Sequence, residues 1–259
     1  MSSVLNGKII ISTRPQGKSK DLQELLQKHG ATLYELPMIE LSGSQNTDEI
    51  NKVLKQLKSF THIAFTSGNA FRFFYDKISK TAFYKENLEH IKIASIGYRT
   101  SEIIKNYGIQ IDFNANARDG REFAQKLAHH IGNEKANILW PTGNLSPNTF
   151  IENLKSNMQI ARLNIYENTA PKNVNHELLT LIQNNQYDMI IIASPSAINH
   201  LSNYIDINNL NITCIGQTSA SAVRAKGLQP KAIALEPNAN GLLQALIQYY
   251  SQNQFTKQK

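Results

Sequence analysis

Short apolar runs alternate with segments of helical periodicity along most of this 259-residue chain. Lys8–Ser12 is an apolar run of strand length, and leucines at 22, 25 and 26 follow it with the spacing of an amphipathic helix that Gly30 ends. Further apolar runs at 62–65 and 189–193 precede helical patterns of their own. Strands that alternate with helices in this way indicate parallel sheets in α/β layers.

Two loops of this pattern resemble one another. Ile96–Thr100 (IGYRT) separates an apolar run from a helical pattern that Gly108 ends, and Ile215–Ser219 (IGQTS) stands between the same kinds of segment, with Gly227 at the helix end. The glycines at 97 and 216 are 119 residues apart, as are those at 108 and 227. In each loop a strand stops, a glycine turn follows, and a helix begins under a hydroxyl side chain. Unpaired backbone N–H groups and the positive end of a helix dipole then point to one place, which suits an anionic ligand.

Three further pairs of segments match in the same order, at offsets of 121–129 residues. They are Thr13 with Thr142 at strand ends, Phe65–Ala70 with Ile192–Ala197, and Asp119-Gly120 with Asn240-Gly241. The constant order predicts an internal duplication of an α/β unit of about 120–130 residues, which is the size of a domain and too long for a solenoid repeat.

The net charge of +7 favours an anionic partner, whether nucleic acid, a membrane surface or an acidic small molecule. The chain has no run of basic residues and no dense basic patch with interleaved aromatics, so a nucleic-acid-binding function rests on charge alone. No apolar run approaches the roughly 20 residues that cross a bilayer, and residues 1–4 lead into a strand without the apolar segment of a signal peptide. We therefore expect a cytoplasmic protein without membrane or nucleic-acid contacts.

Hydroxyl side chains collect where the predicted strands end. Their positions are Thr13, Thr66, Ser67, Thr100, Thr142, Ser194, Ser196, Thr218 and Ser219. Helix capping is the simpler role for any single one of them. Because ligands of parallel sheets bind beyond the carboxyl ends of the strands, loops of this kind would together form an anion-receptive surface if they face one cleft.

Several common kinds of site are absent from the sequence. There is no Gly-x-Gly-x-x-Gly fingerprint and no P-loop, which argues against a dinucleotide or a nucleoside triphosphate. No serine stands in a nucleophile elbow, no acid–base pair of carboxylates is recognisable, and His129-His130 lacks partners at metal-ligand spacing. Cys214, the only cysteine, lies in a predicted buried strand, which favours packing over nucleophilic chemistry. The residues alone predict a duplicated α/β protein for a polyanionic ligand, with no metal site.

Five short motifs stand in a fixed order along the chain. They are Thr13-Arg14-Pro15, Phe65-Thr66-Ser67, Ile96-Gly97 with Thr100, Tyr166, and Ile215-Gly216 with Thr218-Ser219. Their order and spacing resemble the uroporphyrinogen-III synthase family, over about residues 8–250. The resemblance implies an enzyme of tetrapyrrole and haem biosynthesis, a lyase that cyclises linear hydroxymethylbilane with inversion of the last pyrrole ring and loss of water. It also implies that no metal or organic cofactor is used.

The resemblance further implies two parallel-sheet α/β lobes that are joined by two extended crossings and can rotate about them, with the substrate between the lobes. One lobe would comprise residues 1–37 with 170–259 and the other residues 40–167, with crossings near 37–40 and 166–170. It implies a monomer, with room for a transient contact with the preceding enzyme of the pathway. The lobes and the sequence repeat therefore need not coincide.

The matched positions predict the site residues. The candidates for substrate binding are Arg14, Thr66, Ser67, Arg99, Thr100, Ser194, Thr218 and Ser219. Tyr166 is the catalytic candidate, as a hydrogen-bond donor to the departing hydroxyl, and packing against the linker is its alternative role. Arg72 is a further candidate cation that could instead face solvent. Family members often place an arginine shortly after the glycine that follows Trp140, but Gly143–Asn148 contains none, which argues against a charge contact from this loop.

A second class of function remains open at this point. A non-catalytic, two-lobed sensor that closes on a small anionic ligand would also have a duplicated architecture, a hinge and hydroxyl-rich loops. The absence of an attached DNA-binding segment weighs against a sensor. Formation of type III porphyrin from hydroxymethylbilane would distinguish the two.

Overall fold

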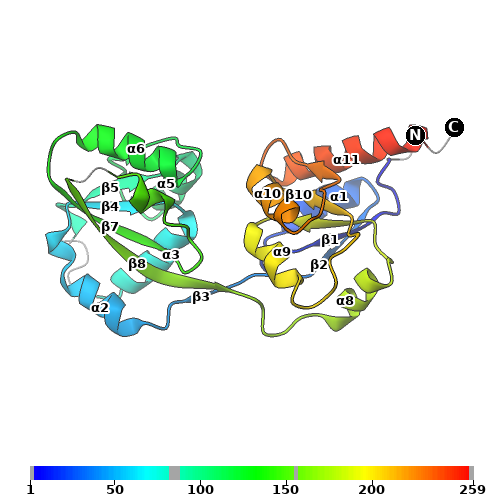
Figure 1. The fold of residues 1–259 in the computed structure, drawn as a ribbon, viewed down its shortest axis with the longest axis horizontal. Helices are drawn as coiled ribbons and strands as arrows, with labels where there is room; N and C mark the ends of the chain where they lie inside the picture. Colours follow the sequence, from blue (N-terminus) through cyan, green and yellow to red (C-terminus); the bar gives the residue numbers. More distant parts are fainter. Residues whose placement is uncertain (1–2, 82–87, 155–156, 257–259) are drawn as a thin grey trace. The chain divides into compact units, whose positions relative to one another are not determined.

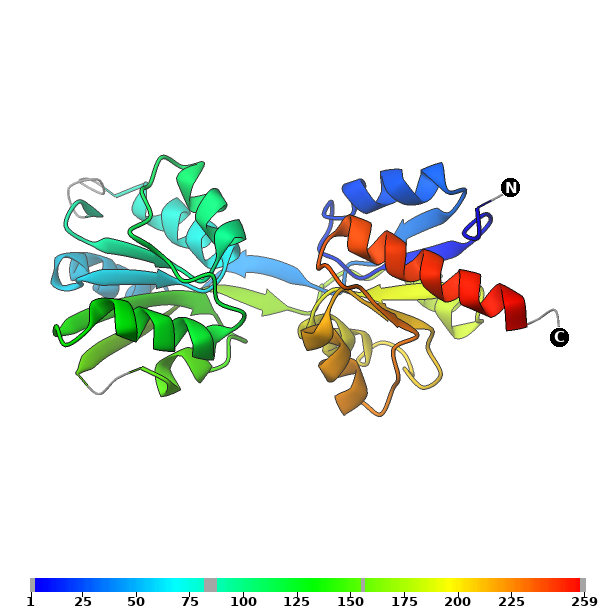
Figure 2. The same ribbon diagram turned by 90° about the horizontal axis from the view of Figure 1, so that it is seen from above.

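The structure is a computed structural model that describes residues 3–81, 88–154 and 157–256, with side chains described to residue 253. The chain divides into two compact units, which we describe separately. Unit 1 comprises Met1–Leu41 and Thr169–Lys259, and unit 2 comprises Ser42–Asn168. Figures 1 and 2 show that each unit is a sheet with helices on both faces. The divisions at 41/42 and 168/169 fall close to the crossings that the sequence predicts near 37–40 and 166–170.

Unit 1 contains a five-stranded sheet of order β11-β10-β9-β1-β2 in which every paired strand is parallel. Its strands are β1 (Ile9–Ser12), β2 (Thr32–Glu35), β9 (Met189–Ile192), β10 (Ile212–Cys214) and β11 (Ala232–Ile233). Its helices are α1 (Lys20–Lys28), α8 (His176–Gln183), α9 (Pro195–Leu201), α10 (Gln217–Ala225) and α11 (Ala239–Thr256). The direction of winding reverses between β1 and β9, which is the point where open α/β sheets bind ligands.

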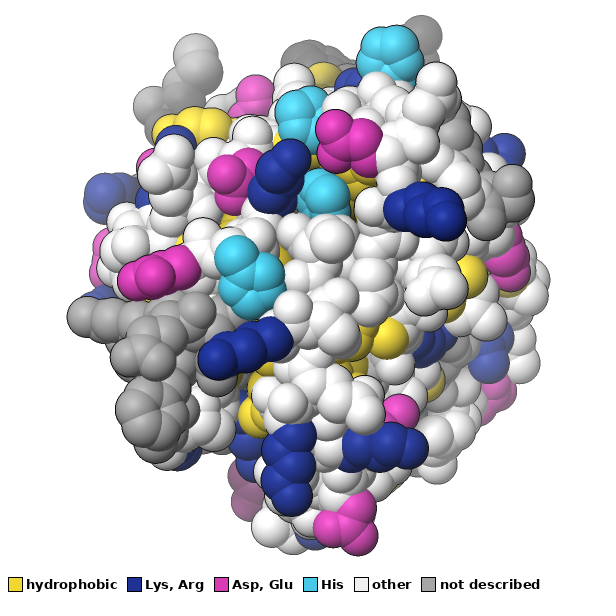
Figure 3. Space-filling model, turned by 90° about the vertical axis from the view of Figure 1, so that its left-hand side faces the viewer, with side chains coloured by type: hydrophobic (Ala, Val, Ile, Leu, Met, Phe, Trp, Pro, Cys, Tyr) yellow, Lys and Arg dark blue, Asp and Glu magenta, His cyan; other side chains and the backbone are white. Residues whose placement is uncertain are grey.

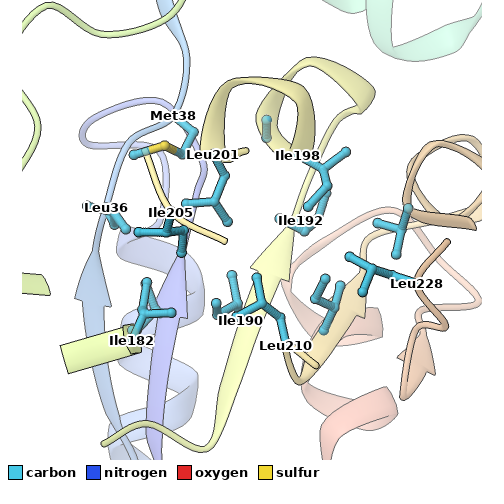
Figure 4. Close-up of a cluster of buried hydrophobic side chains, with 14 of the residues drawn as sticks. Leu36, Met38, Ile182, Ile190, Ile192, Ile198, Leu201, Ile205, Leu210 and Leu228 are labelled. Carbon is cyan, nitrogen blue, oxygen red and sulfur yellow. The ribbon is translucent and has the colours of Figure 1, made fainter. Parts of the chain in front are cut away.

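Alternate residues of the central strands build the two cores of unit 1, because successive side chains of a strand point to opposite faces. Ile10 of β1 packs with α1 and α11, whereas Ile11 packs with α8, α9 and α10. Figure 4 shows the second core, where Ile190 and Ile192 of β9 lie beside Ile198 of α9. Burial on both faces explains why β9 is an unbroken apolar strand.

Unit 2 contains a six-stranded sheet of order β3-β8-β7-β4-β5-β6. Its strands are β3 (Glu40–Gly43), β4 (His62–Phe65), β5 (Lys92–Ser95), β6 (Phe113–Asn114), β7 (Ala136–Gly143) and β8 (Met158–Thr169). Its helices are α2 (Thr47–Lys55), the 3₁₀ turn η1 (Leu57–Ser59), α3 (Gly68–Ile78), α5 (Tyr98–Lys105), α6 (Gly120–Ile131) and α7 (Thr149–Glu152). β8, β7, β4, β5 and β6 pair in parallel, and the winding reverses between β7 and β4.

The two sheets have equivalent orders. Strands β2-β1-β9-β10-β11 of unit 1 correspond in position to β8-β7-β4-β5-β6 of unit 2. The segments that match in sequence fall on equivalent strands, since Gly97 follows β5 and Gly216 follows β10, while Ser67 follows β4 and Ser194 follows β9. The two-unit, parallel α/β architecture is therefore confirmed, and the duplication that would account for it stays a prediction. Within the described ranges, no helix is both long and apolar enough to span a bilayer.

Candidate functional site

The predicted site residues lie at the carboxyl edge of the sheet in each unit, in the loops and first helical turns that follow the strands or, for Tyr166, near the end of β8 itself. The edge of unit 1 carries Thr13, Arg14, Ser194, Thr218 and Ser219, and the edge of unit 2 carries Thr66, Ser67, Arg99, Thr100 and Tyr166. In unit 1 they follow both strands that flank the reversal of winding, β1 and β9. In unit 2 they follow β4, whereas the loop after β7 contains no predicted site residue. The structure thus brings the candidates together within each unit, where parallel sheets place their ligands.

Ser67 and Tyr166 form the best-defined pair of unit 2. Ser67 is the N-cap of α3, where its Oγ accepts the N–H of Ala70 at 3.1 Å, and its hydroxyl lies near the Tyr166 phenol. The Tyr166 ring stacks on Phe73 of α3, with centroids 5.3 Å apart and planes at 14°. Burial raises the pKa of the Tyr166 phenol above its ordinary value, and the nearby Ser67 hydroxyl opposes that rise. The phenol therefore stays protonated at neutral pH.

The Ser67 and Tyr166 hydroxyls can each donate and accept a hydrogen bond. A phenol that stays protonated can donate a proton to a leaving hydroxyl.

A bulge in β8 places Tyr166 on the face of the sheet that carries α3. Thr142 pairs with Asn164, but the next residue, Gly143, pairs with Tyr166, so Ile165 is an extra residue in the ladder. In a regular strand, Tyr166 would point away from the face that Ile165 occupies. The bulge instead lets both residues join the hydrophobic cluster that includes α3. Bulges commonly re-aim a side chain near a functional site.

Gly143 leaves room for the Tyr166 ring. A Cβ at position 143 would lie 2.5 Å from Tyr166 Cζ and 2.8 Å from its hydroxyl oxygen. The backbone φ of Gly143 is not positive, so a side chain is excluded by the ring alone. The glycine that ends β7 is therefore part of the Tyr166 site.

Arg162 of β8 serves the loop 143–148, which has no arginine of its own. Its guanidinium donates to Asn164 Oδ1 at 3.1 Å, to the Gly143 carbonyl at 3.2 Å and to Asn148 Oδ1. It also lies 5.2 Å from the centre of the Trp140 ring. With its N–H groups directed at protein acceptors, Arg162 stabilises the loop rather than presenting its charge to a ligand.

Thr66 also has a partner within unit 2, because Trp140 Nε1 donates to its hydroxyl oxygen at 3.0 Å. Trp140 is almost fully buried and packs on Phe150 of α7, so it fixes the end of β4 against the end of β7. Trp140, Gly143 and Arg162 were not predicted as site residues. Of these three, only Gly143 could have been recognised from the local sequence, because it is a glycine at the end of an apolar segment.

The twin glycine loops present uncapped helix ends. Gly97 and Gly216 are the N-cap residues of α5 and α10, and neither helix has a side-chain cap. The first helical residues are exposed in both loops, including Arg99 and Thr218. At the next position along, Thr100 and Ser219 are buried, with exposed fractions of 7% and 3%. Each loop thus offers backbone N–H groups to an anion, and in unit 2 a nearby guanidinium as well.

Two of the hydroxyls at strand ends in unit 1 form hydrogen bonds within the protein. Thr13 is fully buried and donates to the Ile191 carbonyl at 2.7 Å, which joins the ends of β1 and β9. Ser194 caps α9, where its oxygen accepts the Ala197 N–H at 3.3 Å. Capping does not prevent Ser194 from donating its own proton to a ligand, because a hydroxyl is both donor and acceptor.

The two predicted arginines with ligand-facing roles differ in their surroundings. Arg14 is largely buried, with 14% of its side chain exposed, and its Nη1 lies 3.2 Å from Asp21 Oδ1. Arg99 is exposed at the start of α5, and Arg72 is exposed on α3. Arg99 is therefore free to reorient toward a ligand, whereas Arg14 is held by a carboxylate that would compete with one.

No metal-binding or thiol chemistry accompanies these loops in the part of the chain that the structure describes. Its His, Cys, Asp and Glu side chains form no group of three or more that could hold a metal ion. Cys214 is fully buried in β10, and burial raises the pKa of its thiol to about 12. It is therefore a packing residue and not a nucleophile.

The amino ends of the strands in unit 2 carry histidines in place of hydroxyl loops. His62 begins β4 and is 6% exposed, and its Nδ1 lies 2.8 Å from the Thr61 hydroxyl oxygen. Burial, with the nearby charges of Lys92 and His130, lowers the pKa of His62. Figure 3 shows histidines on one face of the molecule among both basic and acidic side chains, without a single-sign patch among the described residues. This mixed surface contrasts with the anion-receptive loops at the opposite edge of the same sheet.

Comparison with known proteins supplies the family. Residues 20–244 match the family described as uroporphyrinogen-III synthase HemD. The porphyrin biosynthesis protein HemD of Ruminiclostridium josui is 24% identical over 233 residues, which are 88% of this chain and 46% of that protein. The chloroplastic uroporphyrinogen-III synthase of Oryza sativa subsp. japonica is 26% identical over 250 residues, which are 92% of this chain and 80% of that protein. The chain thus spans about half the length of the first relative and most of the second.

A solved structure agrees in fold. A mutant uroporphyrinogen III synthase from the bacterium Thermus thermophilus aligns with a TM-score of 0.67 and 12% identity, covering 95% of this chain and 100% of that one. At this identity the likeness concerns the fold alone. The family match covers far more than half of the residues and includes both units. The chain therefore belongs to the uroporphyrinogen-III synthase family.

Proposed function

We propose that this protein converts linear hydroxymethylbilane into uroporphyrinogen III, inverting the last pyrrole ring and releasing water. Membership of the family supports the proposal, and so do the two carboxyl edges with their anion-receptive loops. The single observation that carries the chemistry is the protonated Tyr166 phenol, which stacks on Phe73 of α3 near the Ser67 cap of that helix. No observation favours the alternative of a non-catalytic sensor.

Tyr166 acts on the leaving group. Its proton is donated to the hydroxyl of the terminal hydroxymethyl group, whose C–O bond breaks with the electron pair going to oxygen, so that water departs. The pyrrole nitrogen supplies electron density to the carbon left behind. To invert the last ring, its substituted carbon first bonds to the carbon left behind, and the bond from that ring carbon to its bridging methylene then breaks with the electron pair returning to the ring. The unsubstituted carbon of the ring bonds to that methylene and releases the proton that restores the phenol. A positioned proton donor typically contributes about 10²–10⁴-fold, and we expect the low end because an electron-rich pyrrole expels hydroxide readily.

The loops hold the substrate by its carboxylates. Backbone N–H groups at the starts of α5 and α10 and the exposed Arg99 bind the acidic side chains, with the hydroxyls of Ser67, Ser194 and Thr218 as further donors. Holding both ends of a linear molecule makes ring closure effectively unimolecular, which can lower a barrier by about 7–11 kcal/mol in favourable cases. The shape of the bound chain then selects the inverted product.

We also propose that the reaction needs neither a metal nor an organic cofactor, because the residues named above complete the step. We further propose a monomer that acts in the cytoplasm, with a transient contact with the enzyme that supplies hydroxymethylbilane. These statements extend the family resemblance, and gel filtration with and without the supplying enzyme tests the last of them.

The isomer ratio of the product tests the function directly. Hydroxymethylbilane made enzymatically is added to the purified chain, the products are oxidised, and the type III and type I porphyrins are separated. We expect mostly type III with this chain and after exhaustive treatment with a chelator. A product mixture equal to that of the no-enzyme control would refute the proposed activity, and loss of activity on chelation would refute cofactor independence.

A further inference from the structure

Arg162 and Tyr166 belong to one strand, but they face opposite sides of the sheet. Arg162 lies over Trp140, which belongs to the cluster formed with α6 and α7, whereas Tyr166 packs on the cluster that contains α3. The bulge at Ile165 produces this difference, since both residues have even positions in the strand. Any influence of Arg162 on Tyr166 must therefore pass around the end of β7.

The loop 143–148 provides that route. On one side, three of its oxygens accept hydrogen bonds from the Arg162 guanidinium. They are the carbonyl oxygens of Gly143 (3.2 Å) and Asn144 (3.5 Å) and Asn148 Oδ1. These acceptors lie at both ends of the loop, so one rigid planar group spans it.

On its other side the same loop contacts Tyr166 and its neighbours. The Cα of Gly143 lies against the phenol ring, with no room for a Cβ. The Asn144 N–H donates to the Tyr166 carbonyl at 3.2 Å, and Asn144 Oδ1 accepts the N–H of Asn168 at 2.8 Å. The backbone and the ring of Tyr166 are therefore both set by where this loop lies.

We propose that Arg162 is a positioning residue for Tyr166, acting through the loop 143–148. The proposal rests on the proposed role of the Tyr166 hydroxyl. Arg162 does not touch the substrate in this account, because its N–H groups serve Asn148, Asn164 and the loop carbonyls.

The geometry requires arginine rather than a positive charge. The guanidinium is planar, carries five N–H donors in a fixed fork, and stacks on aromatic rings. Lysine has a single ammonium on a flexible stem, so it cannot reach both ends of the loop and lie on Trp140 together. Arg162→Lys therefore keeps the positive charge and removes the set of hydrogen bonds that holds both ends of the loop.

The test measures activity and the Tyr166 environment in Arg162→Lys, Tyr166→Phe and the double variant. If the Tyr166 hydroxyl contributes about 100-fold to kcat, near the low end for a positioned proton donor, Arg162→Lys should lower kcat by roughly 10-fold with little change in KM. The kcat of the double variant should be no lower than that of Tyr166→Phe, because without the Tyr166 hydroxyl Arg162 has no group left to position. Arg224→Lys, an exposed arginine in the last turn of α10, is the matched control.

A readout that needs no activity separates this inference from the proposed function. In protein labelled with fluorotyrosine, the ¹⁹F resonance of Tyr166 is the one that Tyr166→Phe removes. It should shift or broaden in Arg162→Lys and stay in place in Arg224→Lys. The fluorescence of Trp140, the only tryptophan of the chain, should also change in Arg162→Lys alone, since the guanidinium lies over its ring.

Asn148→Ala, an exposed loop position, removes one acceptor of Arg162 and serves if Arg162→Lys fails to fold. It should move the same resonance and lower kcat by a smaller factor. An unmoved Tyr166 resonance in the folded variants would overturn the inference. So would kcat losses that multiply in the double variant. Wild-type kcat in Tyr166→Phe would instead refute the proposed role of the hydroxyl, and the resonance would still report whether Arg162 positions the ring.

Discussion

Substitution of Gly143 by alanine should displace the Tyr166 phenol and leave the fold intact. The added Cβ would lie 2.5 Å from Tyr166 Cζ, and an ordinary contact begins at 3.4 Å, so the ring must withdraw by roughly 0.9 Å. A misplacement of about 1 Å can cost around 10²-fold in rate. We therefore expect kcat for type III formation to fall by roughly 10- to 100-fold, to a level no lower than that of Tyr166→Phe.

The cost in stability should be small by comparison. The φ of Gly143 is not positive, so alanine is compatible with the backbone, and the group that must yield is the end of a side chain. Overpacking typically costs about 1–3 kcal/mol, and the lower figure is expected because Tyr166 is only partly buried. A melting curve followed by circular dichroism checks this.

Gly43→Ala provides the matched control. Gly43 also lies in a strand of the unit 2 sheet, at the end of β3, and a Cβ there would meet no atom within 4 Å. That variant should keep wild-type kcat and isomer ratio. A Gly143→Ala enzyme with the same kcat as Gly43→Ala would show that the position of the phenol does not limit the reaction, and the argument from Gly143 to Tyr166 would be wrong.

Three other predictions test Tyr166, Arg99 and the buried His62 separately. Tyr166→Phe should lower kcat by about 100-fold or less with nearly unchanged melting temperature; wild-type kcat would assign Tyr166 to packing. Arg99→Ala should weaken substrate binding by about 1–3 kcal/mol, seen as a higher KM, whereas equal KM values would remove it from the site. The pKa of His62 is lowered in the folded protein from its ordinary value of 6.5, so below that pH the unfolded chain binds more protons than the folded protein does. The free energy of unfolding should therefore fall as the pH drops below 6.5. His62→Gln should flatten this slope in denaturant titrations and the exposed His176→Gln should not; equal slopes would contradict the assignment.

The sequence predicted the features that depend on local pattern. The glycine loops at Gly97 and Gly216 were recognisable because each glycine stands between an apolar strand and a helix that a second glycine ends. Parallel α/β architecture followed from the same alternation. Ser67 and Ser194 were recognisable as residues at strand ends, and both prove to be helix caps.

The contacts that define the Tyr166 environment could not be predicted in the same way. The orientation of Tyr166 depends on an extra residue, Ile165, in the ladder of β8 with β7, and no local pattern marks that bulge. The role of Arg162 depends on a loop 14 to 19 residues earlier in the chain. Thr13 was recognisable as a hydroxyl at a strand end, but it bonds a carbonyl 178 residues away, which only the pairing of β1 with β9 reveals. Tyr166 itself was predicted through the family resemblance and not from its surroundings.

The discontinuity of unit 1 affects how the chain folds as it is synthesised. Strands β1 and β2 emerge first, but β1 is an inner strand of its sheet and pairs with β9, which follows all of unit 2. Unit 2 is continuous, so it can fold before the last 91 residues, Thr169–Lys259, are made. At about 5–20 residues per second, those residues take roughly 5–18 s. During that time the nascent chain carries an apolar strand with an unpaired edge, which is the feature of an incomplete sheet that most invites pairing with another chain.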